Sequence, residues 1–334
     1  MRIDNGHAGR VRLGDPLLDR YLEFVEGRAR PNTVVATASD LRAFFAVVRK
    51  PAVEVTSGDV LAFITAQRRP VGDGRVVRLA DGEAGLSVRT IKRRLSSVSG
   101  LFGYLVMCDI VPRNPVPHGL ATRRRGNRPV ALIRTPRLLP KILNPAEVDA
   151  LFGALRRWRD RAMVEAMVLG GMRRCEVVGL GFDDLRPGER RVFIADGKGG
   201  HQRLVPISSR FFQSVANYID LERPKEATTD RLFVVLKGQR RGQPLTLKGL
   251  DKIVRNASQR AELAHCTCHE LRHTCLTRLR EAGMALEAVQ AQAGHRSLES
   301  TRVYLHLANE WLAAEYRRAA EVIDASRRIE EVTR

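Results

Sequence analysis

A proline-rich stretch without acidic residues divides this chain into two parts. Between Asp109 and Glu147 there is no acidic residue, whereas eight residues are basic. Prolines keep a backbone extended and interrupt helices, and this stretch holds Pro112, Pro115, Pro117, Pro129, Pro136 and Pro140. A chain of 334 residues is long enough to bury two separate cores. We therefore expect one domain at residues 1–111, a basic linker at 112–142 and a second domain from residue 143.

Helix signals dominate both parts. In the first part Asp15 is a cap residue, Gly27 ends the pattern and Ser87 begins another helix. In the second part a helical pattern breaks at Gly170–Gly171. Residues 183–208 then show the alternation and the turn residues of a short antiparallel sheet. The sequence predicts a mainly α fold with a small antiparallel β-sheet (α+β).

Positive charge is the strongest signal in the composition. The chain has 57 Lys and Arg against 37 Asp and Glu, which gives a net charge of +20 and a pI near 10.8. Arginine binds phosphate through paired hydrogen bonds, so this charge favours a nucleic-acid partner. The candidate contacts lie on the helix after Ser87 and in the linker: Arg89, Lys92, Arg93, Arg123, Arg124 and Arg125. The alternatives are a solvated linker and helix face, and a basic composition that reflects a GC-rich genome.

The sequence gives no indication of secretion or of a membrane anchor. No apolar run approaches the roughly 20 residues that span a bilayer. The first residues, MRIDNGHAGRVRLGD, lack the apolar region of a signal peptide. The five cysteines form no even disulfide ladder and fit a reducing compartment. We expect a bacterial cytoplasmic, nucleoid-associated protein without a membrane partner.

A capped helix near residue 270 carries groups that bind phosphate. Thr267 and Glu270 form the capping-box pattern. His269 then lies in the first helical turn, and Arg272 follows three residues later on the same face. A helix N-terminus with a histidine and an arginine favours a phosphate. Capping and surface charge are the alternative interpretation.

Zinc is a rival interpretation of the same segment. Six potential ligands lie within eleven residues: His265, Cys266, Cys268, His269, His273 and Cys275. The spacing C-x-C is not that of a zinc knuckle, and no second cysteine pair occurs elsewhere. We expect no metal here, and we expect these cysteines to pack as small core residues.

Further candidates are spread along the second part. Arg173 follows the glycine turn, and Glu176 lies where its carboxylate can hold the guanidinium. Lys198 lies at a hairpin tip between glycines, and His295 and Tyr304 follow near the C-terminus. The simpler interpretation of Arg173 and Glu176 alone is a surface salt bridge, and the simpler interpretation of Lys198 alone is a solvated side chain. Together with His269 and Arg272, these groups provide what phosphoryl transfer through a covalent tyrosine needs, and that chemistry requires no cofactor.

Four of these elements, in this order and spacing, resemble the tyrosine recombinase/integrase family, which includes the Xer-type recombinases and phage or transposon integrases. They are R-x-x-E at 173–176, the hairpin lysine at 198, H-x-L-R-H-T at 269–274 and G-H-(x)₈-Y at 294–304. The resemblance covers nearly the whole chain. It implies a helical core-binding domain at 1–111 and a catalytic domain at 143–307. It further implies a C-terminal helix at 308–334 that contacts a neighbouring protomer or, alternatively, packs on its own domain.

The resemblance implies a role for each matched residue. Arg173 and Arg272 clamp the scissile phosphate, and Glu176 orients the arginine beside it. Lys198 protonates the leaving 5′ hydroxyl. Tyr304 is the nucleophile and forms a 3′-phosphotyrosyl link.

The two matched histidines complete the implied site. His269 is the acid/base near the nucleophile, and His295 supports the scissile phosphate. The sequence departs mildly from the family pattern, because AGH replaces the more frequent LGH before His295 and Cys175 stands where serine is common.

The implied function is site-specific recombination of double-stranded DNA for integration, excision or transposition of mobile DNA. The resemblance implies a homotetramer on two DNA sites, alone or with partner recombinases. The alternatives are chromosome-dimer resolution by a Xer-type enzyme, a relative that works like a type IB topoisomerase, and a non-catalytic DNA-binding relative.

Overall fold

The computed structural model describes residues 4–5, 11–68, 85–117, 119–121, 129–130, 133, 141–195 and 202–294. The chain divides into two compact units, residues 1–137 and 138–334. The division falls inside the segment 112–142, more than half of which lies outside the described residues. The extended course of that segment therefore stays a prediction.

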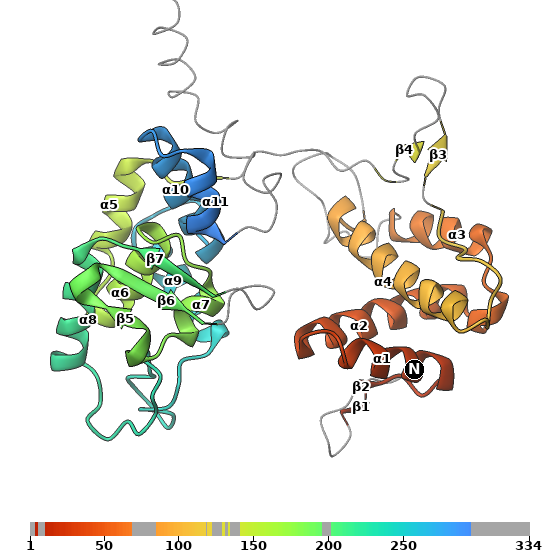
Figure 1. Ribbon diagram of the computed structural model, residues 1–334, viewed down its shortest axis with the longest axis horizontal. Helices are drawn as coiled ribbons and strands as arrows, with labels where there is room; N and C mark the ends of the chain where they lie inside the picture. The colour runs from red at the N-terminus through yellow and green to blue at the C-terminus, as the bar shows by residue number, and fades with distance from the viewer. Residues whose placement is uncertain are drawn as a thin grey trace, which may run out of the picture. The chain divides into compact units, whose positions relative to one another are not determined.

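The described part of the first unit is helical (Figure 1). Its helices are α1 (Pro16–Glu26), α2 (Pro31–Val48), α3 (Ser57–Arg68) and α4 (Val88–Met107), with a 3-10 turn η1 (Ala52–Glu54). Two short antiparallel strand pairs accompany them, β1 (Asp4–Asn5) with β2 (Val11–Arg12) and β3 (Leu120–Ala121) with β4 (Pro129–Val130).

The helices of the first unit begin where the sequence predicts. The carboxylate of Asp15 accepts from the backbone N–H groups of Leu17 and Leu18, and the hydroxyl of Ser87 accepts from that of Thr90. These contacts satisfy N–H groups that have no partner within a helix. Helix α2 packs against α1, α3 and α4, and their apolar faces form one core.

A buried carboxylate ties α2 to α4. Asp40 is 1% exposed, and it accepts from Arg93 Nη1 at 2.6 Å and from Ser97 Oγ at 2.9 Å. Arg93 is thus held on one side by the protein although its side chain is 51% exposed, and Arg89 and Lys92 on the same helix are also exposed. All three predicted DNA-contacting cations of α4 are therefore exposed, and one of them, Arg93, is anchored.

The first core extends past residue 111, where the sequence predicted that the domain ends. Val116 and Ile133 are buried in it, at 9% and 8% exposure. Ser57 Oγ donates to the carbonyl of Pro115 at 2.9 Å, which fixes this stretch against α3. Apolar side chains among the prolines therefore pack on the helices, at least at these positions.

The second unit is mainly helical and has a small three-stranded sheet (Figure 1). Its helices in the described residues are α5 (Pro145–Gly153), α6 (Trp158–Val168), α7 (Arg174–Gly179), α8 (Ser209–Leu221), α9 (Leu247–Arg260), α10 (Cys268–Glu281) and α11 (Leu286–Ala293). Its strands and 3-10 turns are η3 (Phe182–Asp184), β5 (Leu185–Arg186), η4 (Pro187–Glu189), β6 (Arg191–Ile194) and β7 (Arg203–Pro206).

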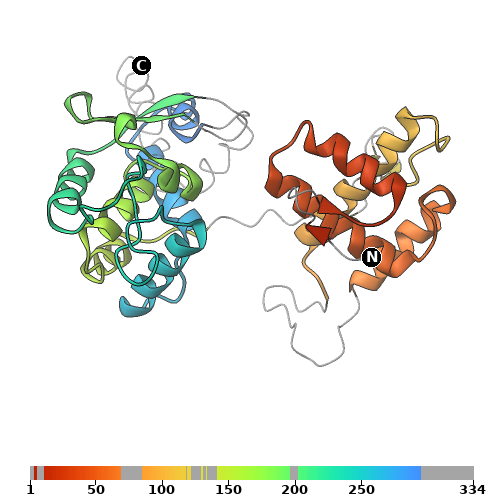
Figure 2. The same ribbon diagram turned by 90° about the horizontal axis from the view of Figure 1, so that it is seen from below.

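Helix α6 is the centre of this unit. All of its residues from Ala162 to Val168 are buried, and it packs against both α8 and α10. The sheet is antiparallel in the order β5-β6-β7, with Val192 opposite Val205 and Ile194 opposite Arg203. Figure 2 shows the same helices and sheet from a second direction. The predicted sheet and the predicted helix break after α6 are both confirmed.

In the part of the chain that the structure describes, no helix is long and apolar enough to cross a membrane.

Candidate active site

A turn of two glycines after α6 brings main-chain atoms close to α10. Gly171 has a φ of +64°, a conformation that side chains with a Cβ rarely adopt. A Cβ at this position would lie 3.2 Å from Leu276 Cδ2 and 3.4 Å from Cys275 Sγ. Both the backbone and the closeness of α10 therefore favour glycine, and the carbonyl of Gly171 is held beside α10.

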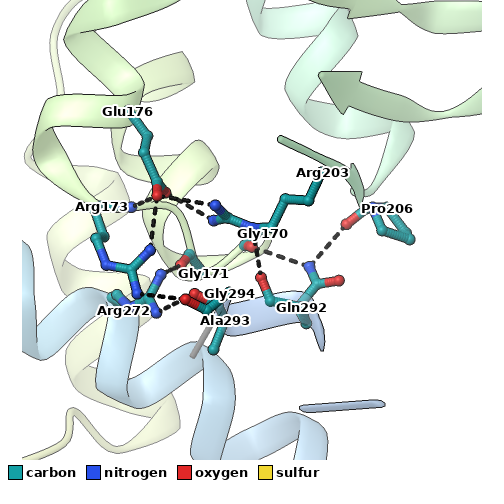
Figure 3. A network of polar contacts seen from close by, with 10 residues as sticks. All are labelled: Gly170, Gly171, Arg173, Glu176, Arg203, Pro206, Arg272, Gln292, Ala293 and Gly294. Atoms are coloured by element: carbon teal, nitrogen blue, oxygen red, sulfur yellow. Dashed lines mark hydrogen bonds and ion pairs between the residues drawn. The ribbon is translucent and has the colours of Figure 1, made fainter. Parts of the chain in front are cut away.

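Arg272 on α10 is buried between this turn and the end of α11. It is 2% exposed, whereas most arginines in the described part of the chain are exposed. Nη1 donates to the carbonyl of Gly171, and Nη2 donates to the carbonyl of Ala293 at 2.6 Å (Figure 3). The guanidinium is thereby fixed from two sides.

Arg173 precedes α7 and reaches the same place. Its Nη1 donates to Glu176 Oε1 at 2.8 Å, which is the predicted ion pair, and its Nη2 donates to the carbonyl of Gly294 at 3.0 Å. Arg173 and Arg272 therefore contact consecutive carbonyls, those of Gly294 and Ala293. These contacts hold both guanidiniums in fixed orientations at the end of α11.

Glu176 is the carboxylate of this cluster. Its side chain is fully buried, and its oxygens accept from the backbone and guanidinium of Arg173 and from both terminal nitrogens of Arg203. Burial disfavours the ionised form, but the hydrogen bonds and charge of Arg203, with those of Arg173, outweigh it and lower the pKa of Glu176 to about 2. Glu176 is therefore ionised at neutral pH.

Arg203 was not predicted as a site residue. It lies on β7 and forms a two-pronged pair with Glu176 at 2.8 and 3.0 Å, while its Nε donates to the carbonyl of Gln292 at 3.3 Å (Figure 3). The strand alternation contains the missed signal, because it puts Arg203 on the same face as the buried Val205. A charged side chain on the inward face of a strand needs a buried partner.

The end of α11 is itself anchored. The side-chain amide of Gln292 donates to the carbonyls of Gly170 and Pro206, both at 3.0 Å. This amide joins the glycine turn, β7 and α11 (Figure 3). The last residue described on this side is Gly294, which directly precedes His295.

His269 lies in the first turn of α10, after the predicted capping box. Thr267 Oγ1 accepts from the N–H of Glu270, and the Glu270 carboxylate accepts from the N–H of Thr267. His269 is exposed, in contrast to the buried Arg272, and its Nε2 lies 2.9 Å from that of His273. Burial and then the charges of His269 and Arg272 lower the pKa of His273 to about 4, so this ring is neutral at pH 7.

The cysteines of this segment pack in the core, as predicted. Cys266, Cys268 and Cys275 are 8%, 5% and 2% exposed, and burial raises the pKa of each thiol to about 12. Their thiols are therefore protonated at neutral pH. Among the described residues, no group of three His, Cys, Asp or Glu side chains is placed to hold a metal ion.

Several predicted residues lie outside the described part of the chain. They are Lys198, His295 and Tyr304 of the predicted site, and Arg123, Arg124 and Arg125 of the predicted linker. The structure brings together Arg173, Glu176 and Arg272. It also describes the strand ends on either side of the hairpin that carries Lys198, which are Ile194 and Arg203.

Comparison with known proteins identifies the family. Residues 141–310, just over half of the chain, match the phage integrase family. The chain belongs to the phage integrase family. Among curated relatives of this integrase-family protein, the tyrosine recombinase XerC of Roseiflexus castenholzii is 31% identical over 294 residues, which cover 84% of each chain. The tyrosine recombinase XerD of Staphylococcus epidermidis is 27% identical over 318 residues, which cover 90% of this chain and 97% of that protein.

Solved structures show the same fold. The Tn1549 transposon integrase in complex with transposon right end DNA matches this chain with a TM-score of 0.67 and 17% identity. The match covers 91% of this chain and 99% of the transposon integrase chain. XerH site-specific recombinase bound to palindromic difH substrate has a TM-score of 0.63 and 20% identity, and the match covers 92% of this chain and 84% of the XerH chain. The predicted family, fold class and enzyme class are confirmed: the chain is a tyrosine recombinase with a mainly helical fold and a small antiparallel sheet.

Proposed function

We propose that this integrase-family enzyme cuts and rejoins double-stranded DNA at specific sites through a 3′-phosphotyrosyl link on Tyr304. The observation that carries the proposal is the convergence of Arg173 and Arg272 at the end of α11. Both guanidiniums bind carbonyls of the two residues before His295. A phosphodiester bound there would lie where the chain continues toward Tyr304.

The charge of the cluster favours an anion. Two guanidiniums, those of Arg173 and Arg203, contact the single carboxylate of Glu176, which gives these three side chains a net charge of +1. Buried charges are costly unless they are paired. A scissile phosphate supplies the missing negative charge, and that charge grows on its non-bridging oxygens as the nucleophile attacks.

The proposed reaction balances without a cofactor. The phenol oxygen of Tyr304 attacks phosphorus, and the bond from phosphorus to the 5′ oxygen breaks. A phenol with an ordinary pKa near 10 must lose its proton during this attack, and we assign its acceptor as His269. The 5′ oxygen gains a proton from Lys198 on the β6–β7 hairpin. Rejoining reverses these steps, and His295 supports the phosphate throughout.

DNA is the proposed partner of both units. Arg89 and Lys92 on α4 are exposed, and with Arg93 and the linker arginines 123–125 they form the proposed contacts to the phosphate backbone. The solved relatives named above include complexes with DNA, which supports this assignment. We propose a homotetramer on two DNA sites, in the bacterial cytoplasm and associated with the nucleoid.

Integration, excision or transposition of mobile DNA is the first biological role that we propose. Chromosome-dimer resolution is the second candidate, because relatives named XerC and XerD match this chain over more than 80% of its length.

Tyr304→Phe tests the proposed chemistry. This change removes one oxygen and keeps the ring, so the affinity for DNA should hardly change. The wild-type protein should form a denaturant-resistant adduct on a nicked substrate, because the short 5′ fragment diffuses away and religation fails. Tyr304→Phe should bind this DNA and form no adduct, whereas the control Tyr316→Phe should react like the wild type. An adduct that persists in Tyr304→Phe would overturn the assignment.

A further inference from the structure

Arg203 is the least expected member of the cluster. It comes from β7, 27 residues after Glu176 in sequence, and its side chain is only 12% exposed. Both of its terminal nitrogens contact Glu176, one at each carboxylate oxygen, and its Nε contacts Gln292. A two-pronged contact of this kind is strong and holds both groups in one orientation.

The Glu176 carboxylate is shared between two arginines. Oε1 accepts from Arg173 Nη1 at 2.8 Å and from Arg203 Nη1 at 3.0 Å. Without Arg203, the buried carboxylate would face Arg173 alone, and the two charges of that pair would cancel. With Arg203 present, the three groups retain one positive charge, and that charge remains available on the side of Arg173.

Arg203 also packs on the chain that leads to His295. Gly294 has a φ of +59°, and a Cβ built there would lie 3.0 Å from three atoms of the Arg203 guanidinium. The plane of Arg203 therefore covers Gly294 closely, while Arg173 Nη2 binds the carbonyl of the same residue. Glycine at this position accommodates both contacts.

We propose that Arg203 is a positioning residue of the recombination site, which neutralises Glu176 so that Arg173 keeps its charge for the scissile phosphate. It acts through Glu176 and binds no DNA itself. At the same time it fixes β7, and with it the base of the Lys198 hairpin, against the end of α11. The inference rests on the proposed function, because it assigns Arg173 to the scissile phosphate.

A double-mutant cycle tests the charge relation. The cycle compares wild type, Arg203→Gln, Glu176→Gln and the double variant by the rate of adduct formation on the nicked substrate. Arg203→Gln should slow this rate by about 100-fold, as expected for losing one group that stabilises the transition state. The double variant lacks the carboxylate that cancels Arg173, so it should react at least about tenfold faster than Arg203→Gln.

The charge role of Arg203 is separated from a structural role by comparing the effect of losing Arg203 when Glu176 is present and when Glu176 is replaced by glutamine. Glu176→Gln and the double variant bury no unpaired carboxylate, so their comparison holds even where Arg203→Gln alone fails to fold. In this background, loss of Arg203 removes only its contact with Gln292 and should slow the rate by less than about tenfold, against about 100-fold when Glu176 is present. An equally large loss in both backgrounds would overturn the charge relation and indicate a purely structural role.

DNA affinity and a matched arginine complete the test. Fluorescence anisotropy should give the same DNA affinity and the same salt dependence of binding for wild type and Arg203→Gln. A weaker and less salt-dependent complex of Arg203→Gln would show that Arg203 contacts DNA and would overturn the proposal. Arg191→Gln is the control on the neighbouring strand, because Arg191 is exposed and its ion pair with Glu189 is long, at 3.7 Å.

If the wild-type protein forms no adduct, the proposed function fails and this inference fails with it. If the wild type reacts and the cycle shows no rescue, the inference alone fails.

Discussion

Replacing Gly171 with alanine should weaken both the fold and the chemistry. The φ of +64° costs a residue with a Cβ about 1–2 kcal/mol. The new Cβ would also press on Leu276 at 3.2 Å and on Cys275 at 3.4 Å, which are both buried, and such overpacking costs about 1–3 kcal/mol. We expect the free energy of unfolding of the second unit to fall by about 2–5 kcal/mol.

The effect on cleavage follows from the carbonyl of Gly171. This oxygen accepts from Arg272, so relief of the contact with α10 should move the acceptor and misplace the guanidinium. A misplacement of about 1 Å can slow an enzymatic step about 100-fold. Adduct formation should therefore slow by 10- to 100-fold, on the order of this effect, while the affinity for DNA should remain.

Two features make this experiment selective. No tryptophan occurs in residues 1–137, and Trp158 begins α6 of the second unit, so its fluorescence in urea follows the unfolding of that unit. Gly283 is a matched control, because its φ is +90° and no atom lies within 4 Å of the position that a Cβ would take there. Gly283→Ala should cost only the backbone strain and leave cleavage unchanged. If Gly171→Ala and Gly283→Ala had equal effects on both quantities, the argument from the close approach of α10 would be refuted.

Three other predictions address the chemistry, the charge and the buried carboxylate of α6. Lys198→Ala should block cleavage of ordinary DNA, but a substrate with sulfur at the 5′ bridging position should restore cleavage, because the sulfur leaves without a proton. The same substrate should not restore cleavage by Arg173→Ala. If it fails to restore cleavage by Lys198→Ala, the acid role of Lys198 is contradicted. The logarithm of the DNA-binding constant should fall with the logarithm of salt with a slope of about −5 or steeper, and a slope near −1 would contradict extensive phosphate contacts. Glu165 is 1% exposed, and burial raises its pKa above the ordinary value of 4.5. The native state therefore holds the proton of this carboxyl group more tightly than the unfolded chain does. As a result, the native state loses stability as the pH rises above 4.5. Glu165→Gln should therefore increase the free energy of unfolding at pH 8 and lose this advantage as the pH falls toward 4.5, whereas an equal gain in urea unfolding at pH 5 and pH 8 would exclude this cause.

The features that the sequence predicted correctly are local. The caps at Asp15, Ser87 and Thr267 depend on residues within three positions of each helix start, and the pair of Arg173 and Glu176 spans one helical turn. Such contacts follow from the spacing of residues along one element, so a single sequence is enough to predict them.

The features that the sequence did not predict depend on tertiary packing. Arg203 meets Glu176 only because β7 returns antiparallel to β6 beside α7, and no short-range pattern records that contact. Similarly, the burial of Val116 and Ile133 depends on the surface that the first four helices offer to the segment beyond residue 111. Prolines and charges dominated the sequence pattern there and concealed the apolar positions.

The end of α11 has a consequence for how such sites vary and how they are probed. Three successive carbonyls, those of Gln292, Ala293 and Gly294, each receive one arginine, from β7, α10 and the start of α7. These acceptors belong to the peptide backbone, which every residue carries. Alanine scanning does not isolate their contribution, because Gln292→Ala removes the amide that anchors α11, residue 293 is already alanine, and a Cβ at Gly294 would lie 3.0 Å from the Arg203 guanidinium. Backbone changes, such as an ester in place of the peptide bond after Ala293, leave the side chains unchanged and will reveal it, and Arg203 limits the side chains that homologues can carry at position 294.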